Sequence, residues 1–189
     1  MATDEELVEE ILAGSQAAME VLVKRHYKTV FAYVYRKLGD YHKAYDLTQE
    51  IFIKMMKHID SYSEKGKFKN WLLTIAVNSC RDYYRSKSFR EAKSEVELKT
   101  NLLDDKNNVA DFFDKKVQRE EIRVAIEGLP EYQKEVVLLR FYHDLKIKEI
   151  AKATDSKEAT VKSRLRQGLT KLGSILKRGE DHVQAKNRG

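Results

Sequence analysis

The residues best suited to chemistry are the basic side chains between Lys146 and Arg178. This segment holds seven Lys and three Arg against Glu149, Asp155 and Glu158, a balance of +7. The whole chain carries only +6, so the rest of the sequence is close to neutral. Positive charge concentrated in this way is typical of a surface that binds a polyanion such as DNA.

The same segment has the periodicity of two helices separated by a short polar turn. Asp155-Ser156 can cap a helix, and apolar residues then recur at helical spacing at Val161, Leu165, Leu169, Leu172 and Leu176. The opposite face carries Lys157, Lys162, Ser163, Arg166, Gln167 and Lys171. A smaller apolar face at Ile147, Ile150 and Ala151 precedes the turn. This pattern favours a helix-turn-helix that places its second helix in the DNA major groove. The alternative is a solvated basic helix without a ligand.

Composition excludes several other classes of protein. With 189 residues, 35% of them charged, one Pro and eight Gly, the sequence predicts a soluble, helix-rich protein of one or two domains. No apolar run reaches the roughly 20 residues that span a bilayer, and the acidic N-terminus is unlike a secretory signal. A single cysteine, Cys80, fits a reducing cytosol. We find no catalytic motif, no metal-ligand spacing and no cofactor motif, so we expect no enzyme.

Four amphipathic helices are expected in the N-terminal half, with Trp71 in the core of their bundle. Their predicted ranges are Glu5–Ala13, Gln16–Leu38, Tyr41–Ile59 and Phe68 to about Lys87, with a polar loop at Asp60–Lys69. Residues 89–115 are acidic and weakly patterned and are interpreted as a linker. Order returns at about Lys116, and Pro130 opens a helix, Glu131–His143, that buries Val136, Val137, Leu139 and Phe141 or their near neighbours. The tail, residues 179–189, is expected to be disordered.

Both halves resemble parts of bacterial sigma factors. LPEYQKEVVLLRFYHDLKIKEIA followed by EATVKSRLRQGLTKL resembles their region 4, and DLTQEIFIKMMKHI followed by FKNWLLTIAVNSCRDYYRSK resembles their region 2. With only these two regions, the chain resembles the extracytoplasmic-function (ECF) class. The resemblance implies an all-α fold of two helical domains, region 2 at 1–88 and region 4 at 116–178, joined by a flexible linker.

The resemblance also implies tasks for particular residues. Reading of the −35 promoter element falls to Thr160, Lys162, Ser163, Arg164, Arg166, Gln167 and Lys171, of which Arg164 and Lys171 are expected on phosphates. Two residues depart from the family pattern: Ala159 replaces a frequent Gly, which can move the helix start, and Lys146 replaces a frequent capping Ser or Thr.

The melted −10 strand is implied to contact residues on the Asp60–Lys69 loop and the helix that follows. They are Lys65, Lys67, Lys69, Asn78, Arg81, Asp82 and Arg85. Tyr83 and Tyr84 are equally suited to base stacking and to packing in the bundle. Docking on the clamp helices of the RNA polymerase β′ subunit is implied for Asp46, Gln49, Glu50 and Lys54.

The expected partners are core RNA polymerase (the β′ clamp helices and the β flap), promoter DNA and an anti-sigma factor. The protein would then be cytoplasmic, or held at the membrane through that anti-sigma factor. Two alternatives stay open at this stage. One is a stand-alone regulator that joins a helix-turn-helix to a helical sensor, and the other is an interaction protein whose basic charge is incidental.

Overall fold

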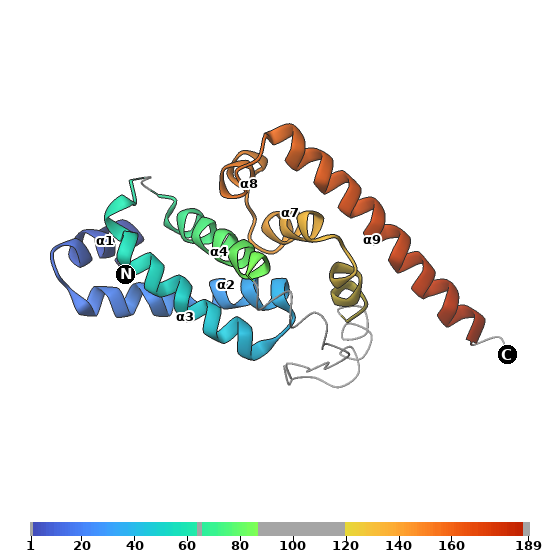
Figure 1. Ribbon diagram of the computed structural model, residues 1–189, viewed down its shortest axis with the longest axis horizontal. Helices are drawn as coiled ribbons and strands as arrows, with labels where there is room; N and C mark the ends of the chain where they lie inside the picture. The colour runs from blue at the N-terminus through green and yellow to red at the C-terminus, as the bar shows by residue number, and fades with distance from the viewer. Residues whose placement is uncertain (1, 64–65, 87–119, 187–189) are drawn as a thin grey trace. The chain divides into compact units, whose positions relative to one another are not determined.

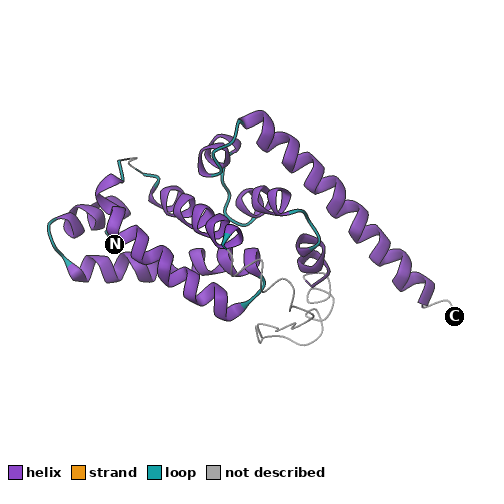
Figure 2. Cartoon of the chain, viewed as in Figure 1, coloured by secondary structure: helices purple, strands orange, loops and turns teal. Residues whose placement is uncertain are grey.

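The computed structural model describes residues 2–63, 66–86 and 120–186, and every regular element in these ranges is a helix (Figures 1 and 2). The first four are α1 (Asp4–Leu12), α2 (Gln16–Leu38), α3 (Tyr41–His58) and α4 (Phe68–Arg85), with the 3₁₀ turn η1 (Ile59–Ser61) before α4. Residues 120–127 are helical. They are followed by α7 (Glu131–Phe141), α8 (Ile147–Ala153) and α9 (Glu158–Lys186). The all-α fold expected from the sequence is confirmed.

Contacts between Cα atoms divide the chain into two compact units. Among the described residues, 2–63, 66–86 and 148–156 belong to the first unit, and 120–147 and 157–186 belong to the second. This division assigns most of α8 to the first unit, whereas the sequence pattern groups it with the C-terminal helices. The expected linker, residues 89–115, lies outside the described residues, and the domain boundaries stay a prediction.

The core of the first unit lies where α2, α3 and α4 pack on one another. Leu22 and Val30 of α2, Ile51 and Met55 of α3 and Leu72 of α4 are almost completely buried. These positions follow the helical period on which the predicted ranges were based. As predicted, α2 begins at Gln16 and ends at Leu38, and the ends of the other three helices lie within two residues of the predicted ends.

Local capping fixes the ends of these helices. The side chain of Ser15 accepts a hydrogen bond from Ala18 N at the start of α2, and Asp40 accepts one from Lys43 N at the start of α3. Gly39 ends α2 with φ +73°, a left-handed conformation that favours glycine. The short Leu38–Tyr41 connection therefore turns the chain from α2 into α3.

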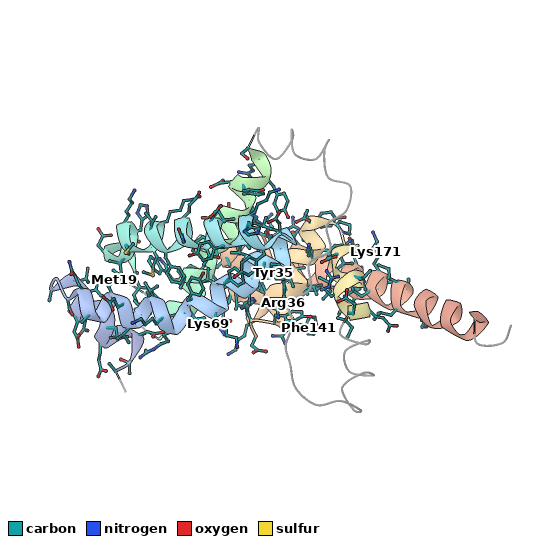
Figure 3. All side chains as sticks on the ribbon, turned by 90° about the horizontal axis from the view of Figure 1, so that it is seen from below. Met19, Tyr35, Arg36, Lys69, Phe141 and Lys171 are labelled. Carbon is teal, nitrogen blue, oxygen red and sulfur yellow. The ribbon has the colours of Figure 1, made fainter. Side chains whose placement is uncertain are left out.

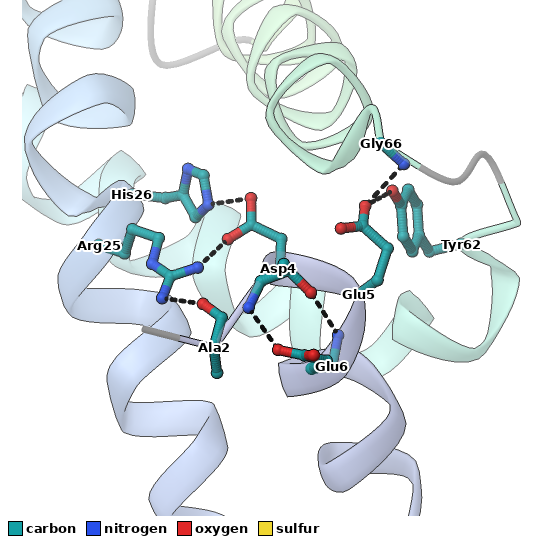
Figure 4. A network of polar contacts seen from close by, with 9 residues as sticks. Ala2, Asp4, Glu5, Glu6, Arg25, His26, Tyr62 and Gly66 are labelled. Carbon is teal, nitrogen blue, oxygen red and sulfur yellow. Dashed lines mark hydrogen bonds and ion pairs between the residues drawn. The ribbon is translucent and has the colours of Figure 1, made fainter.

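A polar cluster fixes α1 on α2. The Asp4 carboxylate accepts hydrogen bonds from Arg25 Nη1 (2.6 Å) and lies 2.9 Å from His26 Nε2 (Figure 4). Burial lowers the pKa of His26, while the neighbouring Asp4 carboxylate opposes that shift. The folded state therefore favours the neutral imidazole.

In the second unit, α9 packs closely on α7 at Gly168, a residue of α9 without a side chain. A Cβ added at Gly168 would lie 3.1 Å from Val137 Cγ2. Gly168 is buried, whereas Leu169, which the sequence places in the apolar stripe, is 47% exposed. The assignment of Leu169 to the buried stripe is therefore wrong, because close approach of the two backbones selects the smaller neighbour.

Two other expectations in the C-terminal half are corrected, and a third stays a prediction. Phe141 is 55% exposed because it ends α7 beyond the buried run that finishes at Leu139. Asp155 has φ +45° and Ser156 N donates to Ala151 O, so this pair ends α8. Its expected capping of the following helix stays a prediction. The tail expected to be disordered from residue 179 is helical through Lys186, because a single glycine weakens a helix without ending it.

Candidate nucleic-acid interface

The N-terminal part of α9 presents basic side chains to solvent. Lys162, Arg166 and Lys171 are exposed, and Lys171 is labelled on α9 in Figure 3. Val161 and Leu165 are buried, and their burial directs the polar positions between them outward. A side chain that reads a base edge must extend freely into a groove. Lys162 and Arg166 meet this requirement.

Two other predicted DNA-contacting residues are held by α7. Gln133 Nε2 donates to Gln167 Oε1 (3.3 Å), and Gln167 Nε2 donates to Ser163 Oγ (3.2 Å). The guanidinium of Arg164 lies over the Tyr132 ring, 5.8 Å from its centroid. Gln167 and Arg164 are therefore oriented before any ligand binds, and the sequence pattern, which treats each helix separately, does not reveal these partners.

A shallow groove follows the exposed face of α9. It is lined by Gln133, Arg166, Gln167, Thr170 and Lys171. Thr160, the first of the predicted contacts, is half-buried one residue before the buried Val161. The free basic side chains therefore lie along the solvent side of the helix, beside residues that α7 holds in place.

Most predicted −10 contacts lie on the surface of the first unit. Lys67, Asn78, Asp82 and Arg85 are exposed, whereas Lys69 and Arg81 are half-buried; Lys65 lies outside the described residues. Asn78, Asp82 and Arg85 follow one another at spacings of three and four and share one face of α4. The first unit therefore presents a polar strip along α4.

The aromatic residues near this strip have structural partners. Trp71, expected in the core, is half-buried with its ring centroid 5.5 Å from those of Tyr62 and Phe68. Tyr84 donates from its hydroxyl to Lys37 O (2.8 Å), and its ring lies 5.9 Å from that of Tyr83. Of the two alternatives for Tyr84, packing in the bundle is the observed one.

The residues expected to dock on polymerase have different surroundings. Asp46, Gln49 and Glu50 are exposed on α3, but Lys54 Nζ donates to Ser79 Oγ of α4 (3.0 Å). Lys54 therefore has a partner within the bundle, and its role in docking stays a prediction.

Beside Gln49, α3 exposes large apolar side chains that the sequence analysis did not select. Tyr45, Ile53 and Met56 are 44%, 45% and 41% exposed. Their spacing places them with Gln49 on one side of α3. The sequence did contain a signal for this surface, because these apolar residues lie outside the helical period of the buried core.

No group of His, Cys, Asp or Glu side chains suited to a metal ion occurs in the part of the chain that the structure describes. Within the same residues, no helix is long and apolar enough to cross a membrane.

Comparison with known proteins identifies the same two regions. Residues 22–90 match the family Sigma-70 region 2, and residues 119–172 match Sigma-70, region 4. The chain is 31% identical over 172 residues to the ECF RNA polymerase sigma-E factor of Escherichia coli, covering 86% of this chain and 88% of that protein. It is 30% identical over 176 residues to the ECF RNA polymerase sigma factor BldN of Streptomyces coelicolor, covering 90% of this chain and 65% of that one.

Two solved structures share the fold. The sigma factor RpoE of Bartonella quintana, solved with the anti-sigma factor NepR, has a TM-score of 0.69 at 21% identity and covers 84% of this chain and 96% of that one. CnrH, solved with the cytosolic domain of CnrY, has a TM-score of 0.66 at 22% identity and covers 93% and 97%.

Proposed function

The chain belongs to the ECF RNA polymerase sigma factors, and we propose that it divides promoter reading between α9, for the −35 duplex, and the α4 region, for the melted −10 strand. A sigma factor directs core RNA polymerase to promoters and is not itself an enzyme. The observation that carries the proposal is the presence of both matched regions in one chain. A stand-alone regulator would account for the second region but not for the first.

At the −35 element, Lys162 and Arg166 contact base edges, and Lys171 contacts phosphate. The exposure of all three side chains supports this assignment. Arg can donate two hydrogen bonds to guanine in the major groove. Three further side chains hold α9 in position against α7: Gln167, Ser163 and Arg164. They contact DNA only at positions next to Lys162, Arg166 and Lys171.

At the −10 element, the exposed side chains of Lys67, Asn78, Asp82 and Arg85 line the path of the single strand. Cations that follow the phosphates and polar groups that meet unstacked bases are the usual combination for such binding. Lys69 and Arg81, which are half-buried, contribute charge near this path.

Polymerase docks on α3 through Gln49 and Glu50 together with Tyr45, Ile53 and Met56. Binding energy at protein interfaces concentrates in a few apolar or aromatic contacts surrounded by polar ones. The exposure of these three apolar side chains beside Gln49 supports this docking surface.

The protein acts in the cytoplasm under the control of an anti-sigma factor. Support comes from the RpoE of Bartonella quintana, which shares the fold and was solved with an anti-sigma factor. Attachment to a membrane would occur only through such a partner.

Run-off transcription with purified core polymerase tests the proposal. The template is selected from random-sequence DNA by the protein bound to core polymerase. Initiation that depends on the protein is expected, and Ile53→Ala should reduce it without changing duplex binding. DNA binding without initiation would favour a regulator, and the absence of salt-dependent DNA affinity would favour an interaction protein.

A further inference from the structure

The carboxylate of Glu5 on α1 holds the chain segment that leads into α4. Its Oε1 atom accepts hydrogen bonds from the Tyr62 hydroxyl (3.0 Å) and from Gly66 N (2.7 Å), as Figure 4 shows. Its own backbone N–H and that of Gly66 lower the pKa of Glu5. An ionised acceptor therefore joins α1 to residues about 60 positions later in the chain.

Glu5 is itself fixed by its neighbours. Thr3 and Glu6 form a reciprocal capping box at the start of α1, and Asp4 is bound to Arg25 and His26 of α2. Leu7 and Val8 of the same helix are buried. The Glu5 carboxylate thus projects from a rigid helix.

The Tyr62 hydroxyl extends this contact to the first turn of α4. It donates to Glu5 and accepts from Lys67 N (3.2 Å). The side chain of Lys67, the N-cap residue of α4, makes no capping hydrogen bond, and Gly66 before it has φ +75°. The early backbone N–H groups of a helix need partners. Here Glu5 and Tyr62 supply partners for two consecutive N–H groups, those of Gly66 and Lys67.

The aromatic part of Tyr62 is held independently of its hydroxyl. Its ring lies 5.3 Å from Phe68, which is 1% exposed, and 5.5 Å from Trp71. Loss of the hydroxyl would therefore leave the ring in place. The polar contacts and the ring contacts can be tested separately.

We propose that Glu5 is a positioning residue for −10 recognition: it fixes the backbone at Gly66 and Lys67 so that the start of α4 is preformed for the melted strand. This inference rests on the function proposed above, in which the same segment meets the −10 strand. A preformed binding segment loses less conformational entropy when its ligand binds. Glu5 touches no DNA in this role and acts through Tyr62, Gly66 and Lys67.

The first test is spectroscopic and needs no DNA. In the full chain, the NMR chemical shift of the Gly66 amide should follow the titration of Glu5, whose pKa is lowered by the backbone N–H groups of Glu5 and Gly66. Glu5→Ala should remove this titration and speed exchange of the Gly66 amide by about tenfold, the value of one hydrogen bond. Glu5→Gln keeps an acceptor oxygen and should restore most of the protection. Glu9→Ala is the matched control, because it removes an equal charge from an exposed position of the same helix, away from the capping box that fixes Glu5.

The second test measures base preference. Each variant, bound to core polymerase, selects from partly melted duplexes with random bases in the single-stranded part. Glu5→Ala and Tyr62→Phe should each weaken the −10 preference by about tenfold and leave the −35 preference unchanged. An unchanged −10 preference, or an equal loss in Glu9→Ala, overturns the inference. If the unsubstituted protein selects no −10 sequence, the proposed function fails, whereas the Gly66 titration still reports whether the contact exists.

Discussion

The close contact between α7 and α9 leads to a prediction about Gly168→Ala. This substitution should destabilise the unsubstituted protein but stabilise a protein in which Val137 is replaced by alanine. An alanine Cβ at Gly168 would lie 3.1 Å from Val137 Cγ2, closer than nine in ten such contacts, and 3.5 Å from Gln133 Cβ, an ordinary distance. Val137 is 2% exposed and cannot turn toward solvent. The crowding is therefore specific to one methyl group of Val137.

The expected magnitudes follow from this contact. Replacing glycine by alanine within a helix stabilises by about 1 kcal/mol, whereas overpacking a buried contact costs about 1–3 kcal/mol. Gly168→Ala should therefore destabilise the second unit by about 1 kcal/mol. Val137→Ala removes the opposing methyl, and in that background Gly168→Ala should stabilise by about 1 kcal/mol.

Hydrogen exchange of the α7 and α9 amides measures both effects. The fluorescence of Trp71, the one Trp in the chain and a residue of the first unit, should stay unchanged. Gly173→Ala is the control on the same helix, because its Cβ would meet nothing within 4 Å. It should stabilise by about 1 kcal/mol in both backgrounds. If Gly168→Ala stabilised as much as Gly173→Ala in the unsubstituted protein, the contact would not be constraining and the reasoning would be refuted.

Three further predictions concern DNA, pH and a turn. Arg166→Ala should weaken binding to the selected −35 duplex by about 1–3 kcal/mol and relax the preference at one base pair. Arg164→Ala removes the same charge but should weaken all sequences alike in anisotropy titrations; equal base preferences in the two variants would contradict the assignment. Because burial lowers the pKa of His26, its contribution to stability is full above its ordinary pKa of 6.5 and is lost as the pH falls through the lowered value. Urea midpoints should therefore fall on acidification, and less steeply in His26→Gln. Gly39→Ala places a side chain at φ +73° in open space and should cost about 1–2 kcal/mol in urea unfolding, purely from backbone strain.

Much of the secondary structure could be predicted because it depends on neighbours in the chain. The α2 range, Gln16–Leu38, follows from its apolar period and from Ser15 and Gly39 at its ends. Prediction was less accurate where a pattern had no strong stop, as after Gly179, where α9 continues to Lys186.

The sequence predicted the type of each candidate site better than the particular residues that form it. Charge and spacing were enough to locate the exposed basic face of α9, since Lys162 and Arg166 are exposed while Val161 and Leu165 are buried. The same reasoning could not separate Arg166 from Arg164, because the ring of Tyr132 comes from another helix. It also could not show that Lys54, which is expected to dock on polymerase, is hydrogen-bonded to Ser79 of α4.

The sequence alone determined that this is an all-helical chain with two sigma-type regions, because helical period, caps and motif residues are encoded within short segments. Only the tertiary structure decided which polar side chains are free and which are held. Glu5 shows the reason: its partners Tyr62 and Gly66 lie about 60 residues away, and no local pattern records a contact that forms only when α1, η1 and α4 come together.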